Sequence, residues 1–158
     1  MNRSLVFGII AALVIIALGS ASGLVSGSGD GNAWFDALAK PNFMPPGWVF
    51  PIVWTILYLL MGLALGQILA TPPSPARRGA ILLFVLQLLL NLAWPSIFFA
   101  THRIGLALAV ILVLDLVVLA AIAGFRAIRR GAALLLLPYP AWLAIATALN
   151  ASIWRMNA

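Results

Sequence analysis

Apolar runs of about 20 residues recur along this chain, and each is long enough to cross a hydrocarbon layer roughly 30 Å thick as a helix. The short connections between the runs fit antiparallel neighbours in one bundle. We therefore predict a bundle of five transmembrane helices. The predicted spans are 4–25, 46–70, 79–100, 104–125 and 132–154.

Composition excludes an ordinary soluble domain, because hydrophobic residues make up 65% of the chain and charged residues 8%. No segment between the spans is long enough for a second domain, so we predict one all-α integral membrane domain over residues 1–158. The chain has no cysteine, no glutamate and one histidine, and we predict neither a metal site nor a cofactor. From composition, one alternative stays open for the first span: Arg3 and the apolar run before Gly19 also resemble a cleavable signal peptide.

The basic residues lie near the ends of the predicted spans, which indicates contact with lipid headgroups rather than with nucleic acid. Six lie on the side of the N-terminus and the connections 71–78 and 126–131, and three lie on the other side. Cytoplasmic loops carry the excess of Lys and Arg. We therefore predict a cytoplasmic N-terminus, in a bacterial membrane, with the first loop and the C-terminus on the opposite side.

The loop of residues 27–45 interrupts the apolar chain with polar and aromatic residues. Between Trp34 and Trp48 the sequence holds two tryptophans, two phenylalanines and three prolines. Such a segment is too rigid and too aromatic for a simple linker. We predict that residues 27–45, called the cap below, fold back over one end of the helices.

Aromatic and amide side chains recur at helical spacing in three spans. Packing between helices explains any single stripe of this kind. Three stripes beneath one cap instead predict a cavity that they line. The stripes are Phe50, Trp54, Tyr58 and Met61 in the second span, Gln87, Asn91, Trp94 and Phe98 in the third, and Trp142, Ala146, Leu149 and Asn150 in the fifth.

Asp115 is predicted near the middle of the membrane, where a charge costs about 2.5–3.5 kcal/mol on insertion scales. Counting residues from the connections places Gln87, Asn91 and Trp142 at the same depth. Two interpretations stay open. Asp115 is a ligand contact or proton site, or it is a neutral acid bonded to Gln87, Asn91 or an indole N–H. His102, in a short turn, is interpreted as a solvated surface residue.

Prolines and glycines inside the spans predict local departures from straight, evenly spaced helices. Pro51, Pro95, Pro138 and Pro140 each remove a backbone donor and favour a kink. Gly19 with Gly23, and Gly62 with Gly66, form faces of small residues. Such faces suit close helix contact, either within the bundle or across a dimer.

Four segments carry a resemblance to a known family: WFDALAKP at 34–41, PPGWVFP at 45–51, NLAWPSIFF at 91–99 and PYPAWLA at 138–144. In this order they resemble the translocator protein family, also called tryptophan-rich sensory proteins or peripheral-type benzodiazepine receptors. The resemblance covers nearly the whole chain and favours a first span that is retained rather than cleaved.

The resemblance implies a five-helix bundle, often a homodimer, with a pocket closed by the first loop. It implies binding of porphyrins such as protoporphyrin, of sterols such as cholesterol, and of synthetic aromatic drugs. Phe98 is added to the candidate site because it continues the stripe of the third span. The pocket residues carried over by position are Phe35, Pro45, Pro46, Trp54, Asn91, Trp94, Trp142, Ala146 and Leu149.

This chain departs from the family pattern at three places. Phe35 stands where the family often has tyrosine, which removes a hydroxyl contact. Ala151 replaces the tyrosine of the family's cholesterol motif, although Leu149 and Arg155 are kept, so strong sterol binding is in doubt. Asp115 has no counterpart, and no family role is carried onto it.

Three functions follow as hypotheses, of which binding or sensing of flat apolar tetrapyrroles leads. Lys40, Arg103 and Arg155 are the candidates for pairing with porphyrin carboxylates. The first alternative is enzymatic breakdown of porphyrin driven by light or oxygen, with Trp54 and Trp142 as the oxidised residues. The second is transport of tetrapyrroles or sterols across the membrane. Acid–base or nucleophilic catalysis is disfavoured by the residues present, so we expect binding rather than an enzyme.

Overall fold

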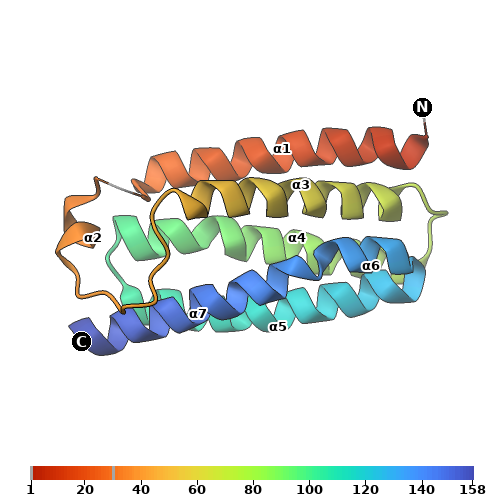
Figure 1. Ribbon diagram of the computed structural model, residues 1–158. Coiled ribbons are helices and arrows are strands. Elements are labelled where there is room, and N and C mark those ends of the chain that lie inside the picture. Colours follow the sequence, from red (N-terminus) through yellow and green to blue (C-terminus); the bar gives the residue numbers. More distant parts are fainter. Residues whose placement is uncertain (1, 30) are drawn as a thin grey trace.

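Helices account for nearly all of the chain that this computed structural model describes, residues 2–29 and 31–158. Five stretches are long and apolar enough to span a membrane, which confirms the predicted all-α membrane fold: α1, α3, α4 with η1, α5, and α6 with α7. The elements in order are α1 (Arg3–Ser26), α2 (Ala33–Ala37), α3 (Val49–Leu69), α4 (Pro75–Pro95), the π-helix η1 (Ser96–Ala100), α5 (Ile104–Ile128), α6 (Arg130–Leu136) and α7 (Pro138–Asn157) (Figure 1).

The spanning helices run side by side, with α1 at the edge of the bundle against α3 (Figure 1). α4 and α5 pack as an antiparallel pair, and α5 also packs against α6 and α7. α6 lies against α3, whereas the backbone of α7 lies against α5 and diverges from α3. Large side chains rather than close backbones therefore join α3 to α7 in the half of the bundle next to the cap.

Glycines set the close approach of α1 to α3. A Cβ added to Gly66 would collide with the backbone of Gly8, and one added to Gly62 would also meet the α1 backbone. On the other side of the same seam, Gly19 lies directly against the ring of Tyr58. Of the two uses predicted for these small residues, the structure shows the one within the bundle.

The prolines act differently at different positions. Pro51 lies in the first turn of α3, where a backbone N–H has no partner within the helix, so the predicted kink at Pro51 is wrong. Pro95 ends α4 and leads into the wide turn η1, in which the Thr101 N–H donates to the Ser96 carbonyl over 3.0 Å. Pro138 begins α7, and the single residue Leu137 separates it from the end of α6. The fifth span is therefore broken, and its second part is redirected toward α5.

Two predicted boundaries also need correction. α3 begins at Val49 rather than at 46, so Pro45 and Pro46 belong to the connection before it. α4 begins at Pro75 rather than at 79, because the Ser74 hydroxyl accepts from the Arg77 N–H and proline suits the first helical position.

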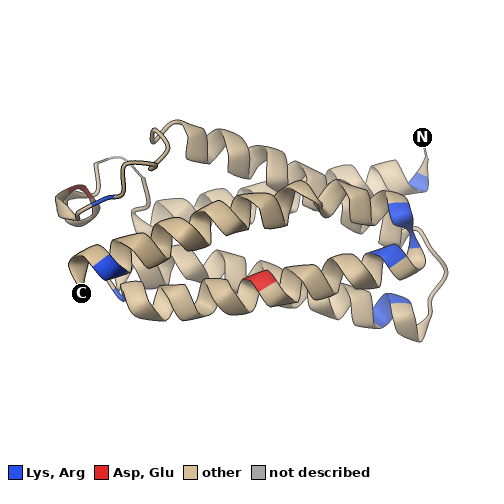
Figure 2. Cartoon of the chain, turned by 60° about the horizontal axis from the view of Figure 1, so that its bottom comes forward, with Lys and Arg blue, Asp and Glu red and all other residues tan. Residues whose placement is uncertain are grey.

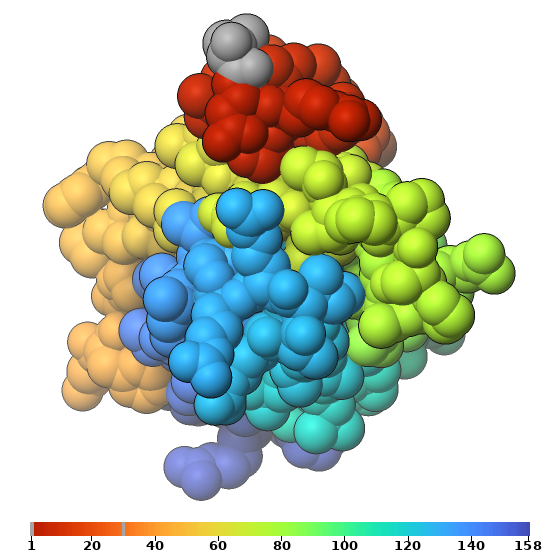
Figure 3. Space-filling model, turned by 90° about the vertical axis from the view of Figure 1, so that its right-hand side faces the viewer, coloured from red at the N-terminus to blue at the C-terminus, as the bar shows by residue number. Residues whose placement is uncertain are grey.

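The basic residues gather at the two ends of the bundle, as predicted (Figure 2). One end carries the six arginines Arg3, Arg77, Arg78, Arg126, Arg129 and Arg130, and the other carries Lys40, Arg103 and Arg155. Figure 3 faces the six-arginine end, with α1 in red above the yellow-green segment that joins α3 to α4. The charged ends bracket an apolar middle, which agrees with an integral membrane protein.

The cap contains a short helix that the sequence analysis did not predict. α1 ends at Gly27, whose left-handed backbone (φ 65°) suits glycine. The Asn32 amide then donates to the Gly27 carbonyl over 2.9 Å, and its oxygen accepts from the Phe35 N–H over 3.0 Å to begin α2. Farther along the cap, the Asn157 side chain forms two hydrogen bonds of 3.0 Å with the backbone of Ala39. The cap is thus held at its start and beyond its middle.

Candidate functional site

A network of buried hydrogen bonds ties α3, α4 and α7 together. The Tyr58 hydroxyl donates to the Asn91 oxygen over 2.9 Å, and the Asn91 amide donates to the Tyr139 hydroxyl over 2.9 Å. Asn91 is 5% exposed and Tyr139 2%. A buried amide must find partners, and these bonds fix the predicted residue Asn91 at the centre of the three helices.

A second polar bridge lies closer to the cap. The Trp94 indole N–H donates to the Asn150 oxygen over 3.1 Å, and the Asn150 amide donates to the Ile104 carbonyl over 3.1 Å. These bonds join α4, α7 and the start of α5. They hold the Trp94 ring flat against Phe98, with the two ring centroids 4.9 Å apart.

Aromatic rings fill the space between α3 and α7. Phe50 contacts Trp142 edge to face with centroids 5.6 Å apart, and Trp54 contacts Tyr139 in the same way at 6.1 Å. Trp54 also lies 5.3 Å from the Tyr58 ring. The indoles at 54 and 142 therefore face neighbouring helices rather than only the surrounding lipid.

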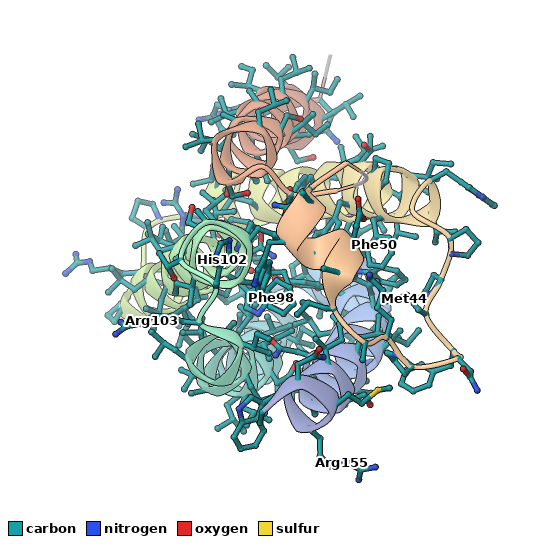
Figure 4. All side chains as sticks on the ribbon, turned by 90° about the vertical axis from the view of Figure 1, so that its left-hand side faces the viewer. Met44, Phe50, Phe98, His102, Arg103 and Arg155 are labelled. Carbon is teal, nitrogen blue, oxygen red and sulfur yellow. The ribbon has the colours of Figure 1, made fainter. Side chains whose placement is uncertain are left out.

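The cap closes over Phe98 of η1. Phe98 is 1% exposed and contacts the rings of Trp34 and Phe35 from α2, with centroids 5.7 and 6.1 Å away. In the end-on view of Figure 4, Phe98 and Phe50 lie beneath α2. His102 is exposed as predicted, but it also stacks on Trp34 with ring centroids 4.1 Å apart, a contact that the sequence analysis missed.

Rings contact one another beneath the cap, where the sequence analysis predicted an open cavity. Two hollows lie outside this cluster of rings. One, of about 480 Å³, lies at the six-arginine end, and one, of about 580 Å³, lies beside the end of α1 between Gly23 and Trp34. The prediction took the broad aromatic faces as walls of a void. In this structure neighbouring rings of these faces contact one another.

Two buried side chains, one on α4 and one on α7, have polar atoms without a hydrogen-bond partner. The Trp142 indole nitrogen and both polar atoms of the Gln87 amide are fully covered and unpaired in the described structure. Leaving such groups unpaired costs about 1–3 kcal/mol each. A polar ligand atom that reached one of these groups would give it the missing hydrogen-bond partner.

The remaining predicted site residues fall into two groups. Leu149 is buried, and Ala146 packs against the main apolar core. Pro45 is half-buried and Pro46 is exposed, both in the connection after α2. Tyr139 was missed as a site residue, although it lies three positions before Trp142 and so on the same helix face.

The three candidate carboxylate partners do not gather at one place. Lys40 is a half-buried residue of the cap, with its ammonium 4.6 Å from the centre of the Phe35 ring and 3.1 Å from the Asp36 carbonyl oxygen. Arg103 and Arg155 are exposed and point away from the bundle (Figure 4). Only Lys40 therefore lies next to the predicted ligand-binding residues.

Asp115 makes a contact that neither interpretation named. Its carboxyl accepts a hydrogen bond of 2.9 Å from the Thr147 hydroxyl, between α5 and α7. The predicted bond to Gln87, Asn91 or an indole N–H is wrong. Counting residues gives the position of Asp115 along the helix axis, but not the neighbouring helix that its side chain faces. Among the described residues, no three His, Cys, Asp or Glu side chains are placed to hold a metal ion.

Taken together, the five spanning helices and the aromatic cap define an integral membrane protein whose helix bundle is covered at one end by its first loop. The model of the TspO/MBR family matches residues 10–155, and the chain belongs to that family.

Characterised relatives include Protein CrtK of Rhodobacter capsulatus, which is 35% identical over 146 residues, or 91% of this chain and 89% of that protein. The tryptophan-rich sensory protein of Cereibacter sphaeroides is 39% identical over 126 residues, or 80% of this chain and 78% of that protein. The human translocator protein is 37% identical over 131 residues, or 82% and 78% of the two chains. The resemblance drawn from the four sequence segments is confirmed.

Proposed function

We propose that this protein binds flat, largely apolar tetrapyrroles of the protoporphyrin type within the membrane, as a binding or sensory protein. Membership of the TspO/MBR family supports a membrane sensory or binding role. The names of the relatives, a sensory protein and a translocator protein, point in the same direction. The choice of ligand is our inference from the residues of the site.

The observation that carries the proposal is the unpaired indole N–H of Trp142, whose ring contacts the ring of Phe50 between α3 and α7. Ligand sites are mostly apolar, with a few polar groups that fix orientation. A tetrapyrrole offers a broad π face to the rings and ring nitrogens or carboxylates to the N–H. A bound tetrapyrrole would give the Trp142 N–H an acceptor, and the packed rings would have to move apart to admit it.

Lys40 is the partner we propose for a ligand carboxylate on the cap side. Its ammonium donates to two carbonyl oxygens of the cap, at 3.1 and 3.3 Å, and rests on Phe35. A carboxylate would give this cation a charged acceptor, which is a stronger hydrogen bond than a neutral one. Arg103 and Arg155 would serve only a carboxylate that reaches out of the bundle.

A titration of the purified protein with protoporphyrin, followed by quenching of tryptophan fluorescence, tests the proposal. Trp142→Phe keeps a ring but removes the N–H, and we expect its affinity to fall by about 2- to 10-fold, the value of one hydrogen bond. Trp154→Phe is the matched control, because Trp154 is 46% exposed on the far part of α7. If both variants lose the same affinity for protoporphyrin, or if neither loses any, the proposed binding site is wrong.

Oxidative breakdown of the porphyrin remains the second candidate, and ring contact of Trp54 with Tyr58 and Tyr139 favours it by placing three oxidisable side chains together. Illuminating the protoporphyrin complex separates the two functions. If Trp54→Phe binds normally but no longer alters the product spectrum, breakdown gains support over plain binding. A homodimer and a cytoplasmic N-terminus are also proposed, from the family resemblance and the charge distribution.

A further inference from the structure

The hollow of about 480 Å³ at the six-arginine end is the feature that the proposed function does not use. It lies at the opposite end of the bundle from the cap, where α1, the end of α3 and the start of α4 come together. Its size falls within the range of small-molecule sites, roughly 300–1,000 Å³. Its lining combines two cations, Arg3 and Arg77, with apolar side chains that include Phe7, Leu69 and Pro72.

Arg77 is held in the wall of this hollow with part of its charge unpaired. Its backbone N–H is fixed by the Ser74 hydroxyl, and its guanidinium donates to the Leu69 carbonyl over 2.9 Å. The Nε–H of the same guanidinium is fully covered and has no partner in the described structure. That N–H is covered by protein, so an anion in the hollow would pair with the other N–H groups of the guanidinium, which share the same positive charge.

Arg3 supplies a second charge at the mouth of the hollow. Its guanidinium carbon lies 5.7 Å from the centre of the Phe7 ring, within the range of a cation–π contact. The positive end of the α4 dipole faces the same region. Of the described acidic residues, Asp36 lies in the cap and Asp115 at mid-span, so neither neutralises these arginines.

We propose that this hollow binds the phosphate of an anionic phospholipid headgroup, with the Arg77 fork as its main donor and Arg3 as the second cation. The position selects a lipid over a free anion. The hollow is lined by Arg3 and Arg77, and its apolar lining suits the glycerol and upper acyl chains. The basic residues at this end of the bundle mark the membrane surface (Figure 2). Basic pockets between helix ends recognise acidic headgroups in this way.

The test is native mass spectrometry of the full-length protein in detergent, with dioleoyl phosphatidylglycerol as the probe and dioleoyl phosphatidylcholine as the uncharged comparison. We expect one retained phosphatidylglycerol in preference to phosphatidylcholine. Arg77→Gln should weaken its retention roughly 10- to 100-fold, the value of a hydrogen bond to a charged group. Arg3→Gln should weaken it about fivefold, the value of one basic residue near an anionic surface.

Arg78→Gln is the matched control, because Arg78 is the next residue, is exposed and does not line the hollow. We expect its retention of phosphatidylglycerol to stay within about twofold of the parent chain, since only non-specific attraction changes. Arg3 is exposed, so Arg3→Gln keeps the test valid if Arg77→Gln fails to fold. Equal losses in Arg3→Gln and Arg78→Gln would overturn the proposal in favour of general charge attraction.

Inorganic phosphate distinguishes the two sources of the anion. At constant ionic strength, 10-fold more phosphate than lipid should leave the bound phosphatidylglycerol in place if the apolar lining contributes. Displacement of the lipid by phosphate would overturn the lipid assignment and leave a site for free anions. Equal retention of phosphatidylglycerol and phosphatidylcholine would overturn the requirement for a net negative headgroup.

Discussion

Replacing Phe98 by alanine is expected to loosen the cap more than it loosens the rest of the bundle. Phe98 is almost fully buried and stands between α2 and α4. It contacts four other rings, two of them, Trp34 and Phe35, in the cap and two, Trp94 and Phe99, in its own span. Removing it therefore takes away much of the surface on which the cap rests.

The magnitude follows from these contacts. Truncating a buried phenylalanine costs about 3–5 kcal/mol of stability in cores that relax little. An aromatic pair contributes about 0.5–1.5 kcal/mol beyond its buried area, so the two pairs to the cap account for roughly 1–3 kcal/mol of cap closure. A change of that size raises the open population of the cap by about 5- to 150-fold.

Hydrogen exchange measures this opening directly. The amide of Asp36 is bonded to the Asn32 carbonyl over 2.8 Å, and that of Leu38 to the Phe35 carbonyl over 3.2 Å, so both report on α2. We expect their exchange in Phe98→Ala to speed up by the factor above, whereas amides in the middle of α5 should change only with global stability. Phe98→Leu, which keeps most of the volume, should fall in between.

Phe43→Ala is the matched control, because Phe43 is also in the cap but is 55% exposed. It should leave the exchange of the α2 amides within about twofold of the parent chain. If Phe98→Ala and Phe43→Ala speed the exchange equally, or if α2 is unaffected by either, the cap does not rest on Phe98 and the reasoning is wrong.

Three further substitutions test other contacts. Gly66→Ala should destabilise the bundle by about 1–3 kcal/mol, because the added methyl collides with α1. Gly79 has open space around it, so Gly79→Ala should be neutral or stabilising. Equal loss of stability in the two variants, measured by unfolding in detergent, would refute the close packing of α1 against α3. Asn157→Ala should remove both bonds to Ala39 and speed amide exchange at Ala39 about fivefold, the value of one net hydrogen bond; unchanged exchange would show that these bonds do not hold the cap. Asp115→Asn keeps an oxygen for its threonine partner and removes a chargeable group, so we expect equal or greater stability; a large loss would indicate a required charge.

The positions of the spans were predictable because the length of an apolar run can be counted directly in the sequence. The charge distribution at the two ends followed from the same reasoning. The boundary at Val49 and the break before Pro138 were less accessible, because a proline in an apolar run signals either a kink or a helix start. Only tertiary packing decides between the two.

The sequence predicted how deep each candidate site residue lies along its helix, but not always which neighbouring helix its side chain faces. Helical spacing placed Asn91 and Trp142 on inward faces, and the structure agrees. Depth alone could not show that Asp115 faces Thr147, because rotation about each helix axis depends on neighbouring side chains. The contacts between the rings could not be predicted either, since aromatic residues that line a cavity also pack well against one another.

The wide turn at Ser96–Ala100 has a consequence for how this stretch of chain can vary. One extra residue is wound into that turn, and it sets the direction from which Phe98 meets the cap. Deleting a residue before Phe98 would restore regular winding but move Phe98 by one helical position, about 100° around the axis. We expect insertions and deletions between Pro95 and Thr101 to be tolerated far less than exchanges of one bulky side chain for another.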